Sequence, residues 1–387
     1  MGKTIKRNHK QHLSNSKKKQ IYSLKHELKE FATILVPSSG LGRIIGYIIA
    51  GGVVFSLALM FVIARWYIVT NKDKPLMVGV TFVPNYARYL GVDPKETFEA
   101  IINDLDVDRV RLVSYWKDIE PVEGQYNFDD LDWQFNLAEK HGTKVSLAIG
   151  MRQPRWPECH EPDWIDASKP RSEWQPALEK FMSAVINRYK DSPALDSYQL
   201  ENEYFLEIFG ECKNFDRQRL VEEYDLVKRL DSNTKVIISR SNNWTIFSGF
   251  PTGDPRADEF GISVYKRVWD RTFTKRHFEY PIPAWFYSSL AGGGKIFTGK
   301  DLMIHELQAE AWTPDGYEIK DAPVEELYKS MNPSRLKNRI KYAADTGMRT
   351  VDLWGAEWWY QMKVNRNEPG LWDTAKQELA YWKNHRN

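Results

Sequence analysis

Short apolar segments alternate with helical patterns along almost the whole chain after residue 76. Eight segments have the length and composition of buried strands: Met77–Phe82, Arg109–Val113, Lys144–Gly150, Leu195–Asn202, Lys235–Ser239, Phe260–Val264, Leu302–His305 and Thr350–Trp354. Helical patterns lie between and after them, among them Lys95–Leu105, Glu173–Lys190, Arg217–Leu230, Arg335–Asp345 and Thr374–His385. Such regular alternation is typical of a (β/α)8 barrel. We therefore predict an α/β fold in which residues 76–387 form a TIM barrel.

A doubly wound open sheet is the structural alternative, because it also alternates strands and helices. It would carry a glycine-rich phosphate-binding turn after an early strand. The one glycine cluster, Gly292 to Gly294, follows no predicted strand and opens no convincing helix. The barrel is therefore the favoured fold.

A long apolar segment precedes the predicted barrel. Ile44–Ala64 holds 21 residues without a charge, between Arg43 and Arg65. At about 1.5 Å per residue, a helix of this length spans the roughly 30 Å hydrocarbon layer of a bilayer. We predict a transmembrane helix at residues 44–64, joined to the barrel by a linker at residues 65–75.

The residues before this segment are strongly basic. Residues 1–43 contain ten Lys or Arg and two acidic residues, a net charge of +8, so the rest of the chain carries −6 against a total of +2. Positive charge before a membrane span predicts a cytoplasmic leader and an extracytoplasmic barrel in a single-pass protein of the cell membrane. Topology and attraction to anionic lipid explain these charges without a nucleic-acid partner. A cleaved signal peptide is the competing interpretation, since Val62 and Ala64 fit a small-residue cleavage rule; the long basic leader and the full-length apolar run favour an uncleaved anchor.

Cysteine is scarce. The two cysteines, Cys159 and Cys212, are too few for a thiolate metal cluster. Both follow candidate strands, the third and the fourth, whose loops are neighbours in a barrel. Outside the cytoplasm they could form a disulfide, and two free thiols are the alternative.

Two glutamates stand directly after predicted strands. Glu203 follows the fourth strand and Glu306 follows the seventh, and the carboxyl ends of barrel strands carry the reactive groups. A pair of carboxyl groups suits glycosidic bond cleavage, in which one donates a proton to the leaving oxygen and the other attacks the anomeric carbon. For a mechanism with retention of configuration, we expect the two carboxyl groups about 5 to 5.5 Å apart. This chemistry needs no metal or cofactor, and we predict neither.

Three stretches of the sequence resemble glycoside hydrolase clan A, the large clan of retaining TIM-barrel glycosidases. They are Arg109-Val-Arg-Leu-Val-Ser-Tyr-Trp116 with Ile119-Glu-Pro-Val-Glu-Gly-Gln-Tyr-Asn-Phe-Asp129 around strand two, Asn202-Glu203 on strand four, and Ile304-His305-Glu306 on strand seven. The resemblance covers nearly all of Met77 to Leu379 and is nearest to families 5, 39 and 42. Many clan members have proline after the acid glutamate, where this chain has Tyr204.

The resemblance implies a role for each matching residue. Glu203 would be the general acid/base and Glu306 the nucleophile, and Asn202 would bind the sugar 2-hydroxyl. Three further residues would support them: Arg111 would stabilise the charged form of Glu306 from beneath, Tyr265 would donate a hydrogen bond to Glu306, and Trp354 would form the floor of the sugar site. Glu201 points to the opposite face of the strand from Asn202, because strand side chains alternate, so we expect it to be structural.

The chain is rich in tryptophan, with 15 residues. Aromatic planes pack against the C–H faces of sugars, and the tryptophans that follow reactive-side strands are candidate platforms. These are Trp116, Trp156 and Trp312, with Trp358 and Trp359 as weaker candidates. Core packing is the alternative for all of them.

An extended connection between residues 265 and 300 interleaves aromatic and basic residues. It could cover the active site and meet an acidic or lipid-linked glycan, or lie against a membrane surface. The alternative is an enlarged sixth βα unit whose aromatic residues pack on the barrel.

The sequence thus predicts a membrane-anchored retaining glycoside hydrolase acting on a poly- or oligosaccharide. Two alternatives share its features. A non-catalytic glycan-binding barrel would keep the aromatic platforms but not the full catalytic set, and a transglycosylase that remodels a surface polysaccharide would use the same residues.

Overall fold

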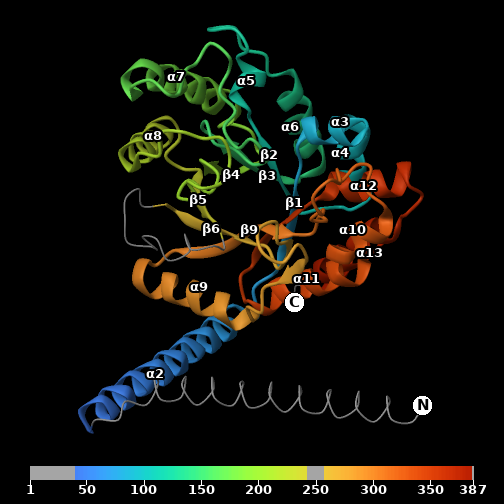
Figure 1. The fold of residues 1–387 in the computed structure, drawn as a ribbon. Coiled ribbons are helices and arrows are strands. Elements are labelled where there is room, and N and C mark those ends of the chain that lie inside the picture. The colour runs from blue at the N-terminus through green and yellow to red at the C-terminus, as the bar shows by residue number, and fades with distance from the viewer. Residues whose placement is uncertain (1–39, 242–256, 386–387) are drawn as a thin grey trace, which may run out of the picture. The chain divides into compact units, whose positions relative to one another are not determined.

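The structure is a computed structural model that describes residues 40–241 and 257–385 (Figure 1). Most of the predicted basic leader therefore lies outside the described residues. The chain divides into two compact units, residues 1–62 and residues 63–387, which are considered separately. The second unit contains the predicted barrel.

Eight parallel strands form a closed barrel, as predicted. The strands are β1 (Met77–Thr81), β2 (Arg109–Val113), β3 (Lys144–Ile149), β4 (Leu195–Leu200), β5 (Lys235–Arg240), β6 (Glu259–Val264), β9 (Asp301–Gln308) and β10 (Thr350–Trp354). Each pairs with its neighbours in chain order, and the pairing of Met77 with Thr350 closes the ring. The observed strands overlap all eight predicted segments and differ from them by up to a few residues at their ends.

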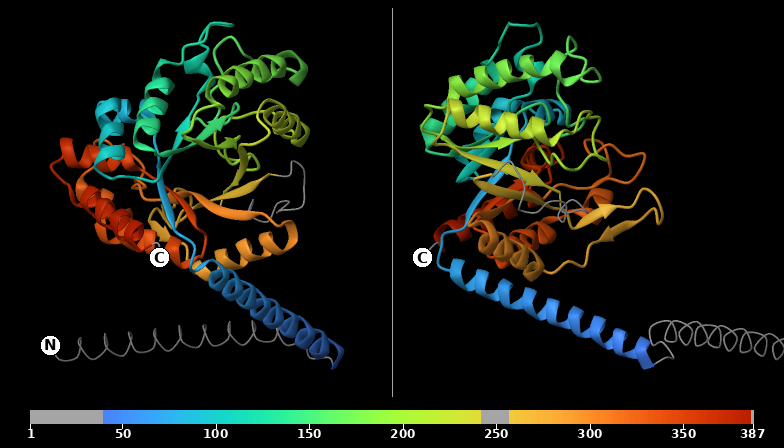
Figure 2. Two further views of the ribbon diagram at one scale, coloured as in Figure 1. Left: turned by 180° about the vertical axis from the view of Figure 1, so that it is seen from behind. Right: turned by 90° about the vertical axis from the view of Figure 1, so that its left-hand side faces the viewer.

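Helices surround the strands on the outside of the ring, as the two views in Figure 2 show. They are α3 (Pro84–Leu90), α4 (Pro94–Asn103), α5 (Trp116–Ile119), α6 (Asp129–His141), α7 (Arg171–Tyr189), α8 (Arg217–Leu230), α9 (Ala284–Thr298), α10 (Val324–Ser330), α11 (Pro333–Asp345), α12 (Ala356–Asn365) and α13 (Gly370–Asn384). In α4, the Asp93 side chain caps the helix by accepting from Glu96 N at 2.9 Å, and Phe98, Ile101 and Ile102 are buried. These apolar residues form the face of α4 that packs on the barrel.

Charged residues fill part of the barrel interior. Arg109 on β2 reaches Asp352 on β10, with Nε 3.0 Å from Oδ1, and both side chains are buried. Gly79 on β1 makes room for this pair, because a Cβ there would lie 2.3 Å from Arg109 Cγ and 2.7 Å from Asp352 Oδ1. Buried charges are costly unless they are paired. Gly79 allows the Arg109–Asp352 pair to form inside the barrel because any larger residue would occupy the same space.

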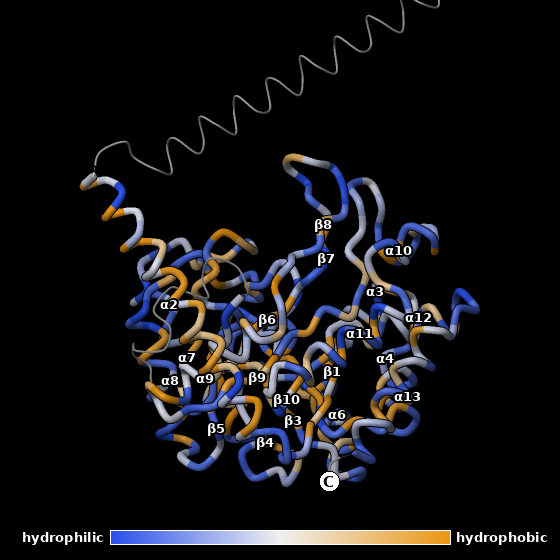
Figure 3. Tube along the Cα trace, turned by 90° about the horizontal axis from the view of Figure 1, so that it is seen from below, coloured by the Kyte–Doolittle hydropathy of each residue, from blue (hydrophilic) through white to orange (hydrophobic). Residues whose placement is uncertain are grey.

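A two-stranded hairpin is inserted after β6. Its strands are β7 (Arg267–Trp269) and β8 (His277–Glu279), which pair antiparallel and stand away from the barrel wall in Figure 3. Glu279 binds Arg335 and Arg339 of α11, with closest distances of 3.2 Å. The extended connection is therefore an enlarged βα unit fastened to the neighbouring helix.

The apolar helix α2 runs from Gly40 to Asn71 and is long and apolar enough to cross a membrane. It extends beyond the predicted span, so most of the expected linker is helical. Its last turns, from Ile63 onward, belong to the barrel unit: Ala64, Tyr67 and Asn71 are buried there. The neighbouring surfaces have glycines at the points of closest approach. A Cβ on Gly292 of α9 would lie 2.7 Å from Ile63 Cγ2, and one on Gly347 would lie 3.1 Å from the Ile68 Cα.

Candidate active site

Glu203 follows β4 in a tight turn. Its backbone adopts φ +43°, and that of Glu201 adopts φ +51°, in the left-handed region that non-glycine residues rarely occupy. The fully buried Glu201 carboxylate accepts from Met151 N at 2.6 Å and from Arg152 N at 3.0 Å, and it pairs with Arg219. Glu201 is therefore a structural anchor between the loops that follow β3 and β4, as expected, and it fixes the turn that presents Glu203.

The Glu203 side chain lies in a buried environment with one hydroxyl partner. Ser239 Oγ accepts from Glu203 N at 2.9 Å, and the Ser263 hydroxyl donates to Glu203 Oε1. Burial, followed by the nearby charge of Glu306, raises the pKa of Glu203 to about 7, whereas the Ser263 hydrogen bond acts in the opposite direction. A carboxyl group with this pKa can give up and take back a proton at neutral pH.

Glu306 on β9 is held by two donors. Arg111 Nη2 lies 2.7 Å from Oε1, and the Tyr265 hydroxyl donates to Oε2 at 2.8 Å. The structure thus brings together the three residues that the sequence predicted to meet. Burial, and then the charge of Glu306, raises the pKa of Tyr265 well above its usual value, so this phenol keeps its proton and remains a donor.

The Arg111 guanidinium connects Glu306 to Asn202 through a chain of hydrogen bonds. Its Nη1 donates to Gln199 Oε1 at 3.1 Å, and Gln199 Nε2 donates to Asn202 Oδ1 at 2.7 Å. The guanidinium carbon also lies 5.5 Å from the centre of the Trp354 ring. Asn202 and Trp354 are therefore both linked to Glu306 through Arg111.

A third carboxyl group, which sequence reasoning missed, lies at the same site. Glu158 is 4% exposed, and its Oε2 accepts from Asn202 Nδ2 at 2.9 Å and lies 3.5 Å from Arg152 Nε. Burial is the largest cause that raises its pKa well above the usual value, and the charges of Glu203 and Glu306 add to it. The sequence singled out the nearby Trp156, but no local pattern marks Glu158 itself.

Arg155 was also missed. It makes two parallel hydrogen bonds to Glu310, at 2.9 and 3.0 Å, and its guanidinium carbon lies 4.1 Å from the Trp354 ring centre and 3.2 Å from that of Tyr86. Arg155 therefore joins the loop after β3 to the loop after β9. Its pairing with Glu310 helps to fix the position of Trp354.

A disulfide joins the loops that follow β3 and β4. Cys159 and Cys212 are bonded to each other, which resolves the alternative between a bridge and two free thiols. Cys159 directly follows Glu158, and Cys212 lies nine residues after Glu203. The bridge therefore holds the segments that carry two of the three carboxyl groups.

These groups open onto a cavity of about 1360 Å³ at the carboxyl ends of the strands. Its walls include Glu158, Glu203, Glu306 and Tyr265. Aromatic side chains form much of the remaining lining: Tyr86, Tyr89, Tyr115, Trp156, Phe209, Trp269, Phe273, Phe278, Tyr280, Trp312, Tyr317 and Trp354. The β7–β8 hairpin contributes three of these and Tyr280 directly follows it, so the inserted hairpin forms a wall of the cavity.

The structure sorts the candidate tryptophans. Trp156 is 61% exposed and lines the cavity, as do Trp312 and Trp354. The expectation for Trp116 is corrected: the side chain is fully buried, stacks on Phe181 and donates from Nε1 to Glu120 at 2.7 Å. Its ring faces the packing between helices, so it cannot form a sugar platform. Trp358 and Trp359 are also fully buried, and packing accounts for them as well.

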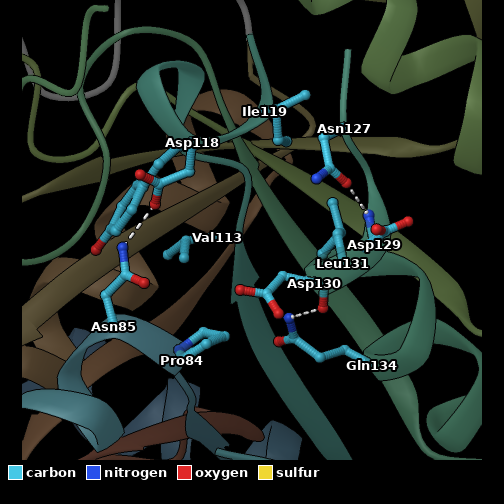
Figure 4. Close-up of a pocket in the computed structure, with 11 residues that line it drawn as sticks. Pro84, Asn85, Val113, Asp118, Ile119, Asn127, Asp129, Asp130, Leu131 and Gln134 are labelled. Carbon is cyan, nitrogen blue, oxygen red and sulfur yellow. Dashed lines mark hydrogen bonds between the residues drawn. The ribbon is translucent and has the colours of Figure 1, made fainter. Parts of the chain in front are cut away.

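A smaller pocket of about 330 Å³ lies beside α3 and α6 (Figure 4). Asn85 Nδ2 donates to Asp118 on one side of it, and Gln134 contacts the Asp130 carbonyl on the other. Burial raises the pKa of Asp118. None of the three active-site carboxyl groups lines this pocket. In the described part of the chain, no cluster of three or more His, Cys, Asp or Glu residues has the geometry of a metal site.

Comparison with known proteins agrees with this arrangement. Residues 94–241 match the glycoside hydrolase 42 family, described as beta-galactosidase. Beta-galactosidase BbgII of Bifidobacterium bifidum is 30% identical over 131 residues, covering 29% of this chain and 19% of the relative. Beta-galactosidase BgaB of a Geobacillus species is 27% identical over 161 residues, covering 35% of this chain and 24% of the relative. The matched part thus spans about a quarter or less of these relatives.

Solved structures share the fold at low sequence identity. The beta-galactosidase of the Antarctic haloarchaeon Halorubrum lacusprofundi has a TM-score of 0.51 at 12% identity, covering 80% of this chain and 58% of that one. A GH5_18 protein from Streptomyces cattleya, solved with GlcNAc, has a TM-score of 0.55 at 12% identity, covering 81% of each chain. These comparisons show that residues 94–241 are similar to glycoside hydrolase family 42 and that the closed barrel has the TIM-barrel fold of these solved structures.

Proposed function

We propose that the protein is a retaining glycosidase that uses Glu203 as general acid/base and Glu306 as nucleophile. The contrast between the two carboxyl environments carries this proposal. Burial raises the pKa of Glu203 to about 7, so that a large fraction holds a proton at neutral pH, whereas Glu306 accepts hydrogen bonds from a guanidinium and a phenol. Pairs of titratable groups whose surroundings differ in this way are typical of acid and nucleophile assignments.

The reaction would proceed in two displacements. Glu306 attacks the anomeric carbon while the bond to the leaving oxygen breaks and Glu203 delivers its proton to that oxygen. Glu203, now ionised, takes a proton from water, which attacks the same carbon and releases Glu306. Asn202 binds the sugar 2-hydroxyl, and Trp354 supports the ring from below.

An oligosaccharide or polysaccharide is the proposed substrate. The cavity volume of about 1360 Å³ exceeds the roughly 300–1,000 Å³ of ordinary small-molecule sites. Trp156 and Trp312 lie on different loops around the cavity and offer aromatic planes to more than one ring. Because the sequence relatives are named beta-galactosidases, we propose a β-galactoside as the first sugar to test.

We further propose that α2 anchors the barrel on the outer side of a membrane. Its length and composition suit a span, and the basic leader favours a cytoplasmic N-terminus. The disulfide suits an oxidising compartment outside the cytoplasm. Ala64 and Tyr67 are helical and buried in the barrel unit, so cleavage after Ala64 would remove a residue that packs there.

A panel of 4-nitrophenyl glycosides tests the activity directly. We expect hydrolysis of at least one β-glycoside, with β-anomeric product formed first when the reaction is followed by proton NMR. Glu306→Gln should reduce turnover on the order of a thousandfold or more, because it removes the nucleophile. Glu203→Ala should be partly rescued by azide on an activated substrate, whereas Glu211→Gln, on an exposed loop, serves as the control.

The outcome also separates the alternatives. Sugar binding without turnover by the wild-type protein would favour a glycan-binding barrel. Transfer products that grow with added acceptor sugar would favour a transglycosylase. An α-anomeric first product would exclude the double displacement.

A further inference from the structure

The active-site cavity contains a carboxyl group for which the two-glutamate reaction has no use. Glu158 lines the cavity with Glu203 and Glu306, yet it is only 4% exposed. We propose that Glu158 is a third substrate-binding carboxyl group, which with Asn202 recognises the substituent on carbon 2 of the sugar at the cleavage point. This inference rests on the proposed glycosidase function and adds a determinant of substrate choice.

The backbone holds Glu158 firmly in place. Its φ of +74° lies in the left-handed region, which is costly for a residue with a Cβ. Gln153 N donates to the Glu158 carbonyl at 2.7 Å, and Glu158 N donates to the Arg155 carbonyl at 2.8 Å. Backbone strain of this kind is tolerated where the surroundings fix the residue, and here it places the carboxyl group against Asn202.

The opposite loop is shaped to receive this side chain. Gly210 faces Glu158, and a Cβ on Gly210 would lie 2.8 Å from Glu158 Cβ. The disulfide at Cys159 ties the same segment to Cys212 on that loop. The position of the Glu158 carboxyl group is therefore set from both sides.

The hydrogen bonds of Asn202 and Glu158 leave polar atoms of both side chains available for a ligand. Asn202 Oδ1 accepts from Gln199, and one Nδ2 hydrogen goes to Glu158 Oε2, which leaves the second Nδ2 hydrogen. Within residues 40–241 and 257–385, the hydrogen bonds to the Glu158 carboxyl group involve Oε2 alone, which leaves Oε1. A hydroxyl group both donates and accepts, so it could bind the amide and the carboxyl group together.

The chemistry of the sugar identifies the substituent. An anomeric carbon placed between Glu203 and Glu306 is bonded to the ring oxygen, the leaving oxygen, carbon 2 and a hydrogen that forms no conventional hydrogen bond. The ring oxygen has no hydrogen to donate, and the leaving oxygen receives its proton from Glu203. Glu158 shares the cavity lining with both glutamates and accepts a hydrogen bond from Asn202, the residue before Glu203, so its carboxyl group meets the group on carbon 2. A hydroxyl group or an amine fits this position, since each carries a hydrogen to donate.

A counter-ion for Arg152 is the competing role for Glu158. The contact between Arg152 Nε and Glu158 Oε2 is 3.5 Å long, and Arg152 Nη2 donates instead to the Phe209 carbonyl at 3.0 Å. A purely structural carboxyl group would affect all substrates alike. A group that binds the carbon 2 substituent would affect only substrates that carry it.

The test compares matched substrates on the full-length protein. From the 4-nitrophenyl glycoside panel, the sugar that the wild type hydrolyses fastest is paired with its 2-deoxy analogue, and kcat/KM is measured for both. Glu158→Gln should lower kcat/KM for the 2-hydroxy substrate about tenfold or more and for the 2-deoxy substrate less than about threefold. The ratio of the two constants does not depend on the fraction of folded protein, so a partly unfolded variant still gives an answer. Glu211→Gln, an exposed carboxylate next to the same disulfide, should leave the ratio unchanged.

The possible failures are distinguishable. If Glu158→Gln and Glu158→Ala lower both constants by the same factor, Glu158 is structural and the inference is overturned while the glycosidase function stands. If the wild type hydrolyses no glycoside of the panel, the proposed function fails and the inference fails with it.

Discussion

Arg111 Nη2 lies 2.7 Å from Glu306 Oε1 and joins β2 to β9 across the interior of the barrel. The same guanidinium donates from Nε to Thr81 on β1 and from Nη1 to Gln199 on β4. One planar cation is thus shared by four strands. Its fixed geometry positions the Glu306 carboxylate relative to Asn202, because both depend on the same guanidinium.

Replacement of Arg111 by lysine should therefore impair catalysis. Lysine keeps the positive charge but cannot make three hydrogen bonds in one plane. We expect kcat to fall by about 10- to 100-fold, measured on an activated aryl glycoside, with a smaller change in KM. Arg88→Lys affects an exposed ion pair with Asp130 and should leave kcat unchanged. An Arg111→Lys enzyme with wild-type kcat would show that Glu306 does not need this contact.

The pH profile should report the proton on Glu203. Because Glu203 must be protonated to act as the acid, kcat/KM should fall as the pH rises through about 7. The Ser263 hydroxyl donates to Glu203 and favours its ionised form, so removal of this hydroxyl should raise the pKa. Ser263→Ala should therefore move the alkaline limb to higher pH, by about 0.5 to 1 unit for a hydrogen bond of ~1 kcal/mol.

Ser183→Ala is the matched control for this shift. The Ser183 hydroxyl donates to the Glu179 carbonyl within α7, away from the cavity. Its profile should superimpose on that of the wild type. A limb that stays in place, or moves to lower pH, in Ser263→Ala would contradict the assignment of Glu203 as the titrating acid.

The tryptophans should separate into binding and packing residues. Trp156→Ala removes an exposed ring from the cavity wall, so KM for an oligosaccharide should rise several-fold with little change in the melting temperature. Trp116→Ala leaves a void in the core and should destabilise the fold by about 3–5 kcal/mol. Thermal melts and steady-state kinetics on both variants check this. A higher KM in folded Trp116→Ala would reverse our correction.

The end of α2 should contribute to the stability of the barrel. A fragment beginning at residue 74 lacks Ala64, Tyr67 and Asn71, whereas one beginning at residue 63 keeps them. Burial of one large apolar side chain contributes about 2 kcal/mol, so the shorter fragment should melt about 3 °C lower or more. In the full chain, Tyr67→Ala should reproduce part of this loss, whereas Tyr47→Ala, which is 74% exposed, should not. Equal melting temperatures for the two fragments would refute the contribution.

Much of the fold could be predicted from the sequence because the barrel strands are buried apolar runs bounded by polar turns. The location of Glu203 and Glu306 at the cavity could be predicted for the same reason, since each stands at the carboxyl end of such a run. The Arg111 contact followed from its position in the middle of β2. In these cases the local pattern and the position around the ring together determine the location of the side chain.

Other features depend on loop conformation and packing, which local patterns do not encode. Glu158 reaches the site because of its left-handed backbone, which the surrounding residues do not reveal, and because of the disulfide beside it, which the sequence left as one of two alternatives. Trp116 follows a reactive-side strand but begins the short helix α5, which turns its ring into the core. The sequence around Tyr67 is that of a linker. Tyr67 is buried because two glycines, Gly292 of α9 and Gly347 in the loop before β10, leave room for its side chain, and this contact is not encoded near Tyr67.

Because Cys159 and Cys212 form a disulfide, assembly of the site depends on the redox state of the surrounding compartment. It closes a stretch of chain with a sequence separation of 53 residues, so its loss would release both catalytic loops into a larger set of conformations. A host cell that keeps thiols reduced would therefore yield a barrel whose walls are intact but whose rim is loosely organised. Recombinant protein should therefore be produced by secretion into an oxidising compartment, where the disulfide can form.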